Sequence, residues 1–459
     1  MANKSVTRRR FLGVLAGITW VGLLAACSAG QSARPTVKPS GGTAAPAGTG
    51  KTKILWWSHW AEEEPRKKIL NAYVQKFKDS HPGVDVEIVW WQKAEMFPAM
   101  RNAFTAGSGF PDIFYFDYMG LEFIQAGWLA DLTDLDWSQV ETWAKPIWKY
   151  PGPGGKEGIF AIPLEVTADE IYYNKAMFEK HSIKVPDNCQ FSANEYLDIC
   201  KKFRAAGIDP LAQGIGDRPY PGTYLTNFVL LAQLGEQSLV DLWKGKMSWK
   251  DPEVATALEY AKKLIDVPVM PATFSTMKLS ESHIYFHTQQ KAAMFMVGSW
   301  YTGRAFSPPE KGGQPPDFRL GFLRYPAMPG GKGNDYKFLT PGGSIAVAEK
   351  SPNKKAALEL AQSIMTVEAG NTWLGISAIG TGIKTDVSKL ESPYKWYFDE
   401  QEKTHQGQKW VVGIDWQLIM PAVMKDAYTN VVNQGFPLGK LSVAQVIDEM
   451  EAARAKVKA

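Results

Sequence analysis

The stretch from Lys53 to Asp117 alternates short apolar runs with amphipathic segments of helical period. Three apolar runs are predicted to be strands, and the two segments between them are predicted to be helices: 54–57, 62–80, 84–91, 94–106 and 111–117. This alternation is typical of a parallel sheet with right-handed crossovers. Ligands of such open sheets bind beyond the carboxyl ends of the strands. Glu62 and Arg66, spaced i,i+4 in the favourable orientation, are expected on the solvent side of the first helix.

The whole chain has 459 residues, more than one hydrophobic core usually serves. Further apolar runs occur after residue 158, and a largely helical region separates them. We therefore expect an α/β protein with two lobes around a cleft. The expected first lobe comprises approximately residues 51–160 and 305–370, and the second approximately 165–300 and 371–459.

The N-terminus has the pattern of an export signal. A twin-arginine stretch, Thr7 to Leu12, leads into an uncharged apolar run that ends in Leu-Ala-Ala-Cys27. This ending resembles the lipobox of bacterial lipoproteins, so residues 1–26 are predicted to be a lipoprotein signal peptide and Cys27 a lipid-anchored N-terminus. Residues 27–50 are then a flexible tether, rich in Pro, Gly and small residues. We expect the mature protein at the extracytoplasmic face of the membrane, or in the periplasm if an outer membrane is present.

The basic charge of the chain belongs to this signal. Residues 1–26 hold four basic residues and no acid, so their removal takes the formal net charge from +4 to 0. The composition therefore gives no argument for nucleic acid binding. Cys189 and Cys200 remain in the exported part, where they could form a disulfide or be two separate buried thiols.

Motifs for catalysis or metal binding are weak. There is no Gly-x-Ser-x-Gly turn, no phosphate-binding Gly-rich loop with Lys and no pair of Cys at zinc spacing. His283 and His287 are spaced i,i+4, but the segment lacks the Glu of the zinc protease motif, so both are expected at the surface. We expect no cofactor, no metal and no enzymatic activity.

Several sequence blocks, in this order, resemble the extracellular solute-binding proteins of family 1. This family comprises sugar-type receptors of ABC importers and includes maltose-binding protein. The blocks are KILWWSHW, FKDSHPGVDVEIVWW, FTAGSGFPDIFYFD, GWLADLTDL, GIFAIPLEVTADEIYYNKAMFEK, AAMFMVGSWYTGRAF and TPGGSIAVAEKSPNKKAALELAQSIM. The resemblance covers most of residues 51–459. It implies a two-lobe periplasmic-binding-protein-like fold (type II), with a hinge and a ligand cleft between the lobes, that works as a monomer and delivers a small solute to a membrane permease.

The resemblance also implies ligand-facing residues. Asp117 follows the third strand, Glu165 lies on a segment that crosses between the lobes, and Trp300, Gly343 and Trp416 match positions that face the cleft in the family. Four of them have a structural alternative: Asp117 could cap a helix, Glu165 could form a structural salt bridge, and Trp300 and Trp416 could fill the core.

The residues of Trp-Trp-Ser-His-Trp add to this set. Trp56 is expected inside the first strand, whereas Trp57, His59 and Trp60 lie where that strand ends and the cleft begins. Aromatic faces cover the C–H faces of a sugar, and carboxylates bind its hydroxyls. The sequence therefore predicts a carbohydrate receptor. A peptide or polyamine receptor of the same architecture, or a secreted glycoside-acting enzyme, is the alternative.

Overall fold

The computed structural model describes residues 51–218, 222 and 224–457. The predicted signal peptide, the lipidation site Cys27 and the tether lie outside the described residues. The first lobe is built on a four-stranded sheet with the order β11-β3-β1-β2. Its strands are β1 (Thr52–Ser58), β2 (Val84–Trp90), β3 (Ile113–Phe116) and β11 (Ser344–Val347). β1, β2 and β3 are parallel, and β11 is antiparallel to β3.

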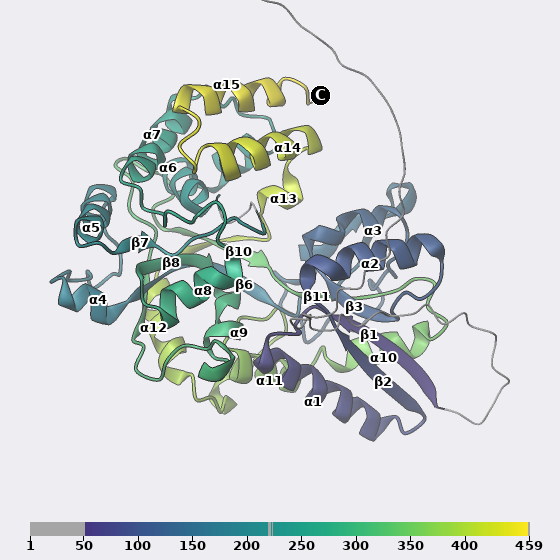
Figure 1. The fold of residues 1–459 in the computed structure, drawn as a ribbon. Helices are drawn as coiled ribbons and strands as arrows, with labels where there is room; N and C mark the ends of the chain where they lie inside the picture. The colour runs from purple at the N-terminus through teal and green to yellow at the C-terminus, as the bar shows by residue number, and fades with distance from the viewer. Residues whose placement is uncertain (1–50, 219–221, 223, 458–459) are drawn as a thin grey trace, which may run out of the picture. The chain divides into compact units, whose positions relative to one another are not determined.

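The crossover helices of the first lobe follow from this strand order. The chain steps from β1 to β2 in one direction and from β2 to β3 in the other, so right-handed crossovers put α1 and α2 on opposite faces of the sheet (Figure 1). The helices of this lobe are α1 (Glu64–Ser80), α2 (Lys93–Ala106), α3 (Leu121–Gln125), α10 (Lys354–Ser363) and α11 (Val367–Ser377). A small hairpin, β4 (Lys149–Pro151) and β5 (Glu157–Ile159), completes it.

The second lobe has a larger mixed sheet with the order β12-β10-β6-β8-β7, and β9 also pairs with β6. Its strands are β6 (Val166–Asn174), β7 (Asp209–Leu211), β8 (Ala292–Gly298), β9 (Leu320–Leu323), β10 (Tyr336–Pro341) and β12 (Lys409–Val412). Its longer helices are α5 (Ala193–Ala205), α6 (Tyr224–Trp243), α7 (Pro252–Asp266), α12 (Lys395–His405), α14 (Ala422–Asn430) and α15 (Val443–Arg454). Its short helices are α4 (Lys175–Lys180), α8 (Leu279–His283), α9 (Thr302–Ala305) and α13 (Trp416–Ile419).

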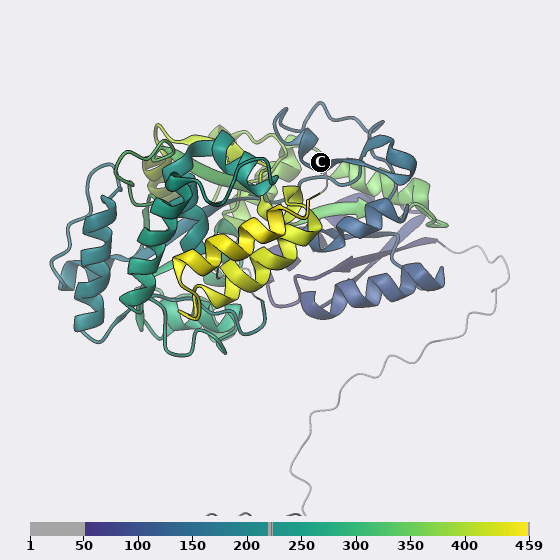
Figure 2. The same ribbon diagram turned by 90° about the horizontal axis from the view of Figure 1, so that it is seen from above.

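Each lobe has its own hydrophobic core. The core of the first lobe is rich in large rings: Trp56 and Trp60 are fully buried, and Trp60 packs against Tyr115 and Trp373 with ring centroids 5.2 and 5.4 Å apart. The core of the second lobe is formed largely by α5, α6, α7, α14 and α15 around the sheet. Figure 2 shows the two lobes side by side, with α14 and α15 (yellow) on the second.

Three segments of the described chain meet between the lobes and are hydrogen-bonded to one another. The Glu165 N–H donates to the carbonyl oxygen of Gly343 (2.7 Å), and the Glu165 carbonyl accepts from the Gly342 N–H (2.8 Å). The Val166 N–H donates to the carbonyl oxygen of Gly380 at 2.9 Å. The connection between the lobes is therefore a small backbone-paired unit and not a set of independent loops.

The strand pairing corrects the expected lobe boundaries. Residues 305–341 were expected in the first lobe, but β9 and β10 pair with β6 and belong to the second. The first lobe also extends past residue 370, because Trp373 and Ile383 are buried in its core. The physical reason is that β6 needs hydrogen-bonding neighbours on both edges, and segments distant in sequence supply them.

The disulfide between Cys189 and Cys200, which the sequence left possible, is not formed. Cys189 and Cys200 are free thiols, and both are buried. Cys189 lies in a turn with a positive φ of 58°, whereas Cys200 faces the core of the second lobe from α5. Burial raises the pKa of the Cys200 thiol, so it behaves as a small hydrophobic side chain.

We predict that both thiols are free in the purified protein. Alkylation under denaturing conditions without reductant should modify the peptides containing Cys189 and Cys200, and prior reduction should not raise the yield. The melting temperature should not change with reductant, because no cross-link constrains the unfolded chain. Peptide mass spectrometry measures the first result and thermal unfolding the second; labelling that requires reduction would contradict the prediction.

Candidate functional site

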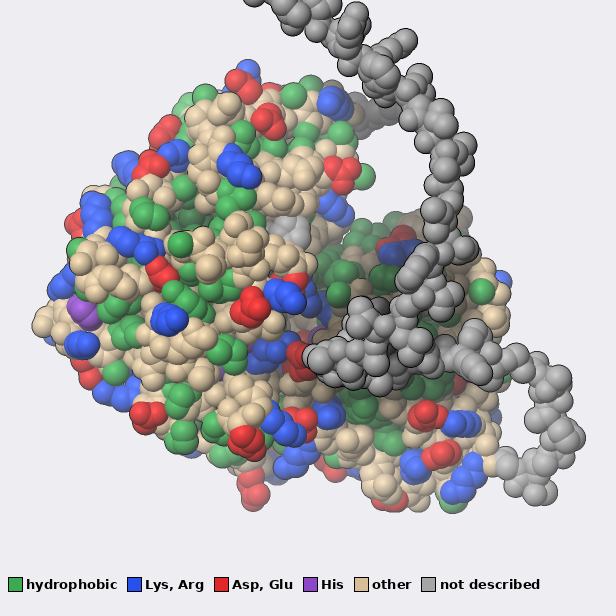
Figure 3. All heavy atoms as spheres, in the orientation of Figure 1, with side chains coloured by type: hydrophobic (Ala, Val, Ile, Leu, Met, Phe, Trp, Pro, Cys, Tyr) green, Lys and Arg blue, Asp and Glu red, His purple; other side chains and the backbone are tan. Residues whose placement is uncertain are grey.

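A cavity of about 480 Å³ lies between the ends of the two sheets, and Figure 3 shows the surface hollowed between the lobes. The first lobe lines it with residues that follow or end its parallel strands: His59, Trp60, Gln92, Lys93, Tyr115, Asp117 and Tyr118. The second lobe lines it with residues at the matching edge of its sheet: Thr167, Asp169, Trp300, Thr340, Asp415 and Trp416. The cavity therefore lies where strand ends of both sheets meet, as the sequence predicts.

The wall between the lobes is held by a fully buried cation, Arg66 on α1. Its guanidinium is 2.8 Å from the Glu63 carboxylate and 2.6 Å from the Glu165 carboxylate, and it donates to the carbonyl of Trp300 at 3.3 Å. The other Glu165 oxygen accepts from the Gly343 N–H at 2.8 Å. Removal of Arg66 would leave the buried Glu165 carboxylate without its cation, which is strongly destabilising. The expectation that Arg66 lies on the solvent side of its helix is wrong, because Arg66 is fully buried and contacts both the connecting segment and the second lobe.

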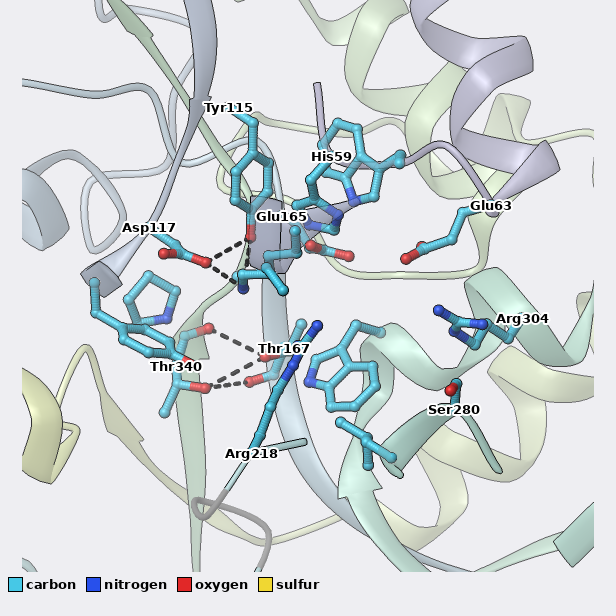
Figure 4. A pocket seen from close by; sticks show the side chains of 18 of the residues that line it. His59, Glu63, Tyr115, Asp117, Glu165, Thr167, Arg218, Ser280, Arg304 and Thr340 are labelled. Carbon is cyan, nitrogen blue, oxygen red and sulfur yellow. Dashed lines mark hydrogen bonds and ion pairs between the residues drawn. The ribbon is translucent and has the colours of Figure 1, made fainter. Parts of the chain in front are cut away.

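A second ionic cluster lies at the end of β3 (Figure 4). Lys93 forms an ion pair with Asp117, and the Tyr115 hydroxyl donates to the same carboxylate at 2.8 Å. The remaining Asp117 oxygen accepts from the Met119 N–H at 2.8 Å and caps a short 3-10 helix. Burial, and then the charge of Asp117, raises the pKa of Tyr115 well above its usual value, so Tyr115 stays a neutral donor. Asp117 thus has the capping role that the sequence left open as an alternative.

Six of the eight predicted ligand-facing residues line the cavity: His59, Trp60, Asp117, Glu165, Trp300 and Trp416. Trp57 does not. It points to the other face of β1 and packs against Trp91 with ring centroids 4.7 Å apart, as the twofold periodicity of a strand requires.

Gly343 is not among the residues that line the cavity either. It lies behind Glu165 and leaves no room for a side chain, because a Cβ there would be 2.5 Å from the Trp60 ring.

The aromatic residues that line the cavity differ in the exposure and packing of their rings. Trp300 is partly exposed and stacks on His283 (5.7 Å, 27°), whereas Trp416 is 4% exposed and packs against Tyr428 (4.9 Å). His59 lies edge-on to Tyr115 at 4.1 Å. Burial, and then Lys93, holds the pKa of His59 well below its usual value, so this imidazole is neutral at neutral pH. Rings in three different environments therefore face one cavity.

His283 and His287 are buried, which corrects the expectation that both lie at the surface. His287 is hydrogen-bonded to the Tyr301 hydroxyl (2.8 Å) and the Gly312 carbonyl (2.9 Å). In the described part of the chain, no group of three or more His, Cys, Asp or Glu residues could hold a metal ion.

Several lining residues were missed by sequence reasoning. Arg304 on α9 pairs with Glu62 of the first lobe at 3.0 Å, and nothing in the local sequence indicates this contact. Thr167 and Asp169 could have been found, because alternate residues of a strand share a face and Glu165 was already placed toward the cleft. Thr167 faces Thr340 on β10, with their hydroxyl oxygens 3.3 Å apart (Figure 4).

Asp169 and Asp415 form the least compensated part of the cavity. Burial, and then the nearby charge of Asp415, raises the pKa of Asp169 to about 8. Burial also raises the pKa of Asp415. Beneath them, Glu170 is paired with the buried Lys337 and with His405 (2.9 Å). Burial opposes the ionisation of Glu170, but Lys337 and His405 lower its pKa to about 2.

The raised pKa of Asp169 predicts a pH-dependent stability. Between its pKa in the unfolded chain, about 4, and its folded value, about 8, only the folded state holds the proton, so the free energy of unfolding falls as the pH rises. The variant Asp169→Asn has no proton to lose and should lose less stability between about pH 5 and about pH 8. Thermal unfolding of both proteins across this range measures the difference. The exposed Asp187→Asn serves as control and should follow the wild type; parallel curves for Asp169→Asn and wild type would contradict the prediction.

Comparison with known proteins agrees with this arrangement. The family model described as bacterial extracellular solute-binding protein matches residues 60–371. An uncharacterized ABC transporter extracellular-binding protein from Pyrococcus horikoshii is 24% identical over 317 residues, covering 68% of this chain and 67% of that protein. A probable ABC transporter-binding protein from Deinococcus radiodurans is 27% identical over 212 residues, covering 45% of this chain and 47% of that protein, so the matched part is about half of that relative.

Solved structures share the fold at low sequence identity. A chain from a study of xylan utilization by Caldanaerobius polysaccharolyticus has a TM-score of 0.73 at 20% identity, covering 88% of this chain and 100% of that chain. A chitin oligosaccharide binding protein has a TM-score of 0.71 at 19% identity, covering 88% of this chain and 98% of that chain. The GacH receptor of Streptomyces glaucescens, solved unliganded and with acarbose, has a TM-score of 0.67 at 18% identity, covering 88% and 98%.

These similarities confirm the predicted two-lobe type II fold. Within the described residues, no helix is both long and apolar enough to cross a membrane. The match of the family model over more than half of the chain identifies the family. The chain belongs to the bacterial extracellular solute-binding proteins.

Proposed function

We propose that the protein is the receptor of an ABC importer, that it binds a carbohydrate in the cavity between its lobes, and that it delivers this solute to the membrane permease. The observation that carries the proposal is the lining of the cavity. Trp60, Trp300 and Trp416 bring aromatic rings to the same space as the carboxylates of Asp169 and Asp415. A sugar has C–H faces for the rings and hydroxyl groups for the carboxylates.

The size of the cavity supports a small solute. A volume of about 480 Å³ lies within the usual range for small-molecule sites, about 300–1,000 Å³. The names of the structural neighbours, which include a chitin oligosaccharide binding protein and a receptor solved with acarbose, support the same class of ligand.

Binding is proposed to work by hinged closure, with the three backbone-paired connecting segments as the hinge. A solute that touches both lobes stabilises the closed state by the contacts it makes only there. Residues of both lobes, among them Lys93 of the first and Trp300 of the second, line the cavity, so a solute in it can contact both. We propose that the protein acts as a monomer at the extracytoplasmic face, held by a lipid at Cys27, with residues 27–50 as the tether.

Two alternatives remain to be separated from this proposal. A peptide or polyamine receptor would share the architecture, and a secreted glycoside-acting enzyme would also use carboxylates in a cleft. An assay for released reducing sugars from oligosaccharides tests the enzymatic alternative directly; turnover that is lost on substitution of a cavity carboxylate would overturn the non-enzymatic proposal.

We predict that a panel of mono- and oligosaccharides contains ligands that raise the melting temperature, whereas short peptides do not. For the best sugar, Trp300→Ala should weaken binding by about 1–3 kcal/mol, or about 5- to 150-fold in Kd, because it removes a ring surface at the cavity wall. Trp396, which is 39% exposed and does not line the cavity, supplies the matched control Trp396→Ala. Titration calorimetry measures both variants; stabilisation by peptides alone, or equal affinity of Trp300→Ala and wild type, would refute the sugar proposal.

A further inference from the structure

One corner of the cavity has carboxylates but no cation. This acidic corner comprises Asp169 at the start of β6, Asp415 and Trp416 at the start of α13, and Asn227 on α6, and all four residues line the cavity. The strand register brings them together: Ala168 pairs with Leu339 of β10, and Leu339 pairs with Val412 of β12. Asp169 comes directly after Ala168, and Asp415 comes three residues after Val412, so the two acids lie near the same edge of the sheet.

The other charges of the cavity are compensated within the protein. Among the lining cations, Arg66 is paired with Glu63 and Glu165, Lys93 with Asp117, Arg304 with Glu62, and Arg218 with Asp217 at 3.6 Å. Lys278, the remaining lining cation, is exposed.

In contrast, no Lys, Arg or His of the described chain lies within ion-pair distance of Asp169 or Asp415. The Asp415 carboxylate accepts from the Gln417 N–H at 2.7 Å, and the Asp169 carboxylate has no hydrogen bond to any described residue. Lys425 acts on Asp415, and Lys337 acts on Asp169, only from beyond ion-pair distance, and neither lysine lines the cavity. The two acids thus face the cavity without a cation in direct contact.

Asn227 adds an independent polar group to this corner. It is 9% exposed, and its Oδ1 accepts a hydrogen bond from the Tyr428 hydroxyl. Its Nδ2 has no partner among the described residues, so this buried amide keeps two donors available at the cavity wall. The Trp416 ring rests on the same Tyr428, which fixes the amide and the indole relative to each other.

We infer that the ligand carries a protonated primary amine that binds between Asp169 and Asp415 against the Trp416 ring, with an adjacent hydroxyl that accepts from Asn227. This inference rests on the proposed function and specifies it, because a carbohydrate with these groups is an amino sugar. The ammonium forms charge-assisted hydrogen bonds with both carboxylates and a cation–π contact with the indole. A neutral hydroxyl in its place leaves Asp415 without a cation in contact, and leaves Asp169 to be relieved by its own proton. The same ammonium also occurs in polyamines, which lack the ring and the hydroxyl.

The test compares matched ligands on the full protein at neutral pH. Titration calorimetry is carried out with glucosamine against glucose, galactosamine against galactose, and the glucosamine disaccharide of chitosan against cellobiose, with spermidine as the polyamine. At least one amino sugar should bind about tenfold more tightly than its neutral partner. Asp169→Asn and Asp415→Asn should each reduce this preference to less than about threefold. The exposed Asp187→Asn should leave it unchanged.

Each outcome bears on one of the two proposals. If neutral sugars bind as tightly as amino sugars, or if the preference survives in both variants, the amine inference is wrong while the carbohydrate proposal stands. If spermidine alone binds, and does so in an Asp169-dependent way, the ammonium site between the two carboxylates stands, whereas the adjacent hydroxyl and the carbohydrate proposal both fail. The readout is the ratio of the affinities of two ligands for one protein sample. Partial unfolding of a variant lowers both affinities alike, so it cannot by itself reduce the preference. Binding of no probe overturns the inference.

Discussion

The cavity depends on one buried cation, Arg66. It has no exposed surface, and it is held by a carboxylate beside its own helix (Glu63), by a carboxylate on a connecting segment (Glu165) and by the carbonyl of Trp300 in the second lobe. In a site of low dielectric, a guanidinium without these partners would cost several kcal/mol. The three elements are therefore held together as a set. Glu165 extends the constraint further, because its second oxygen is bound by the backbone of Gly343 in another connecting segment.

Glycines make this arrangement possible. A Cβ at Gly303 on α9 would lie 1.4 Å from a guanidinium nitrogen of Arg66, so a side chain at this position would displace the guanidinium. The rings of Trp60 and Trp373 each lie with their centroids 6.0 Å from the guanidinium carbon and exclude water from it. The same indole of Trp60 that shields Arg66 also forms part of the cavity wall. The same side chain therefore contributes to the stability of the interlobe contact and to the shape of the cavity. A substitution of Trp60 is expected to affect both.

The sequence predicts the elements that follow from local periodicity, but not the contacts between segments that are distant in the chain. The parallel strands of the first lobe and the residues at their ends were predicted, because each apolar run and its terminus are continuous in the chain. Arg66 was misplaced because its spacing from Glu62 has the pattern of an exposed helical pair, whereas its true partner Glu165 is 99 residues away. β9 and β10 were assigned to the wrong lobe for the same reason, since their neighbour β6 is distant in sequence. Sequence spacing also could not exclude a bond between Cys189 and Cys200, because it contains no separation in space.

Charge is distributed unevenly around the cavity: the acids of one wall are paired with cations of the protein, and Asp169 and Asp415 of the other wall are not. The acids of the first lobe and of the connecting segment are compensated by Arg66 and Lys93, so this wall has the same net charge with or without a ligand. Asp169 in the second lobe must be relieved by a proton or by a ligand cation. Glu165 and Asp169 are four residues apart on one continuous extended segment, about 13 Å at the usual rise per residue. A ligand that relieves Asp169 would therefore act on the strand that continues directly from Glu165, the residue that Arg66 holds in the connecting segment.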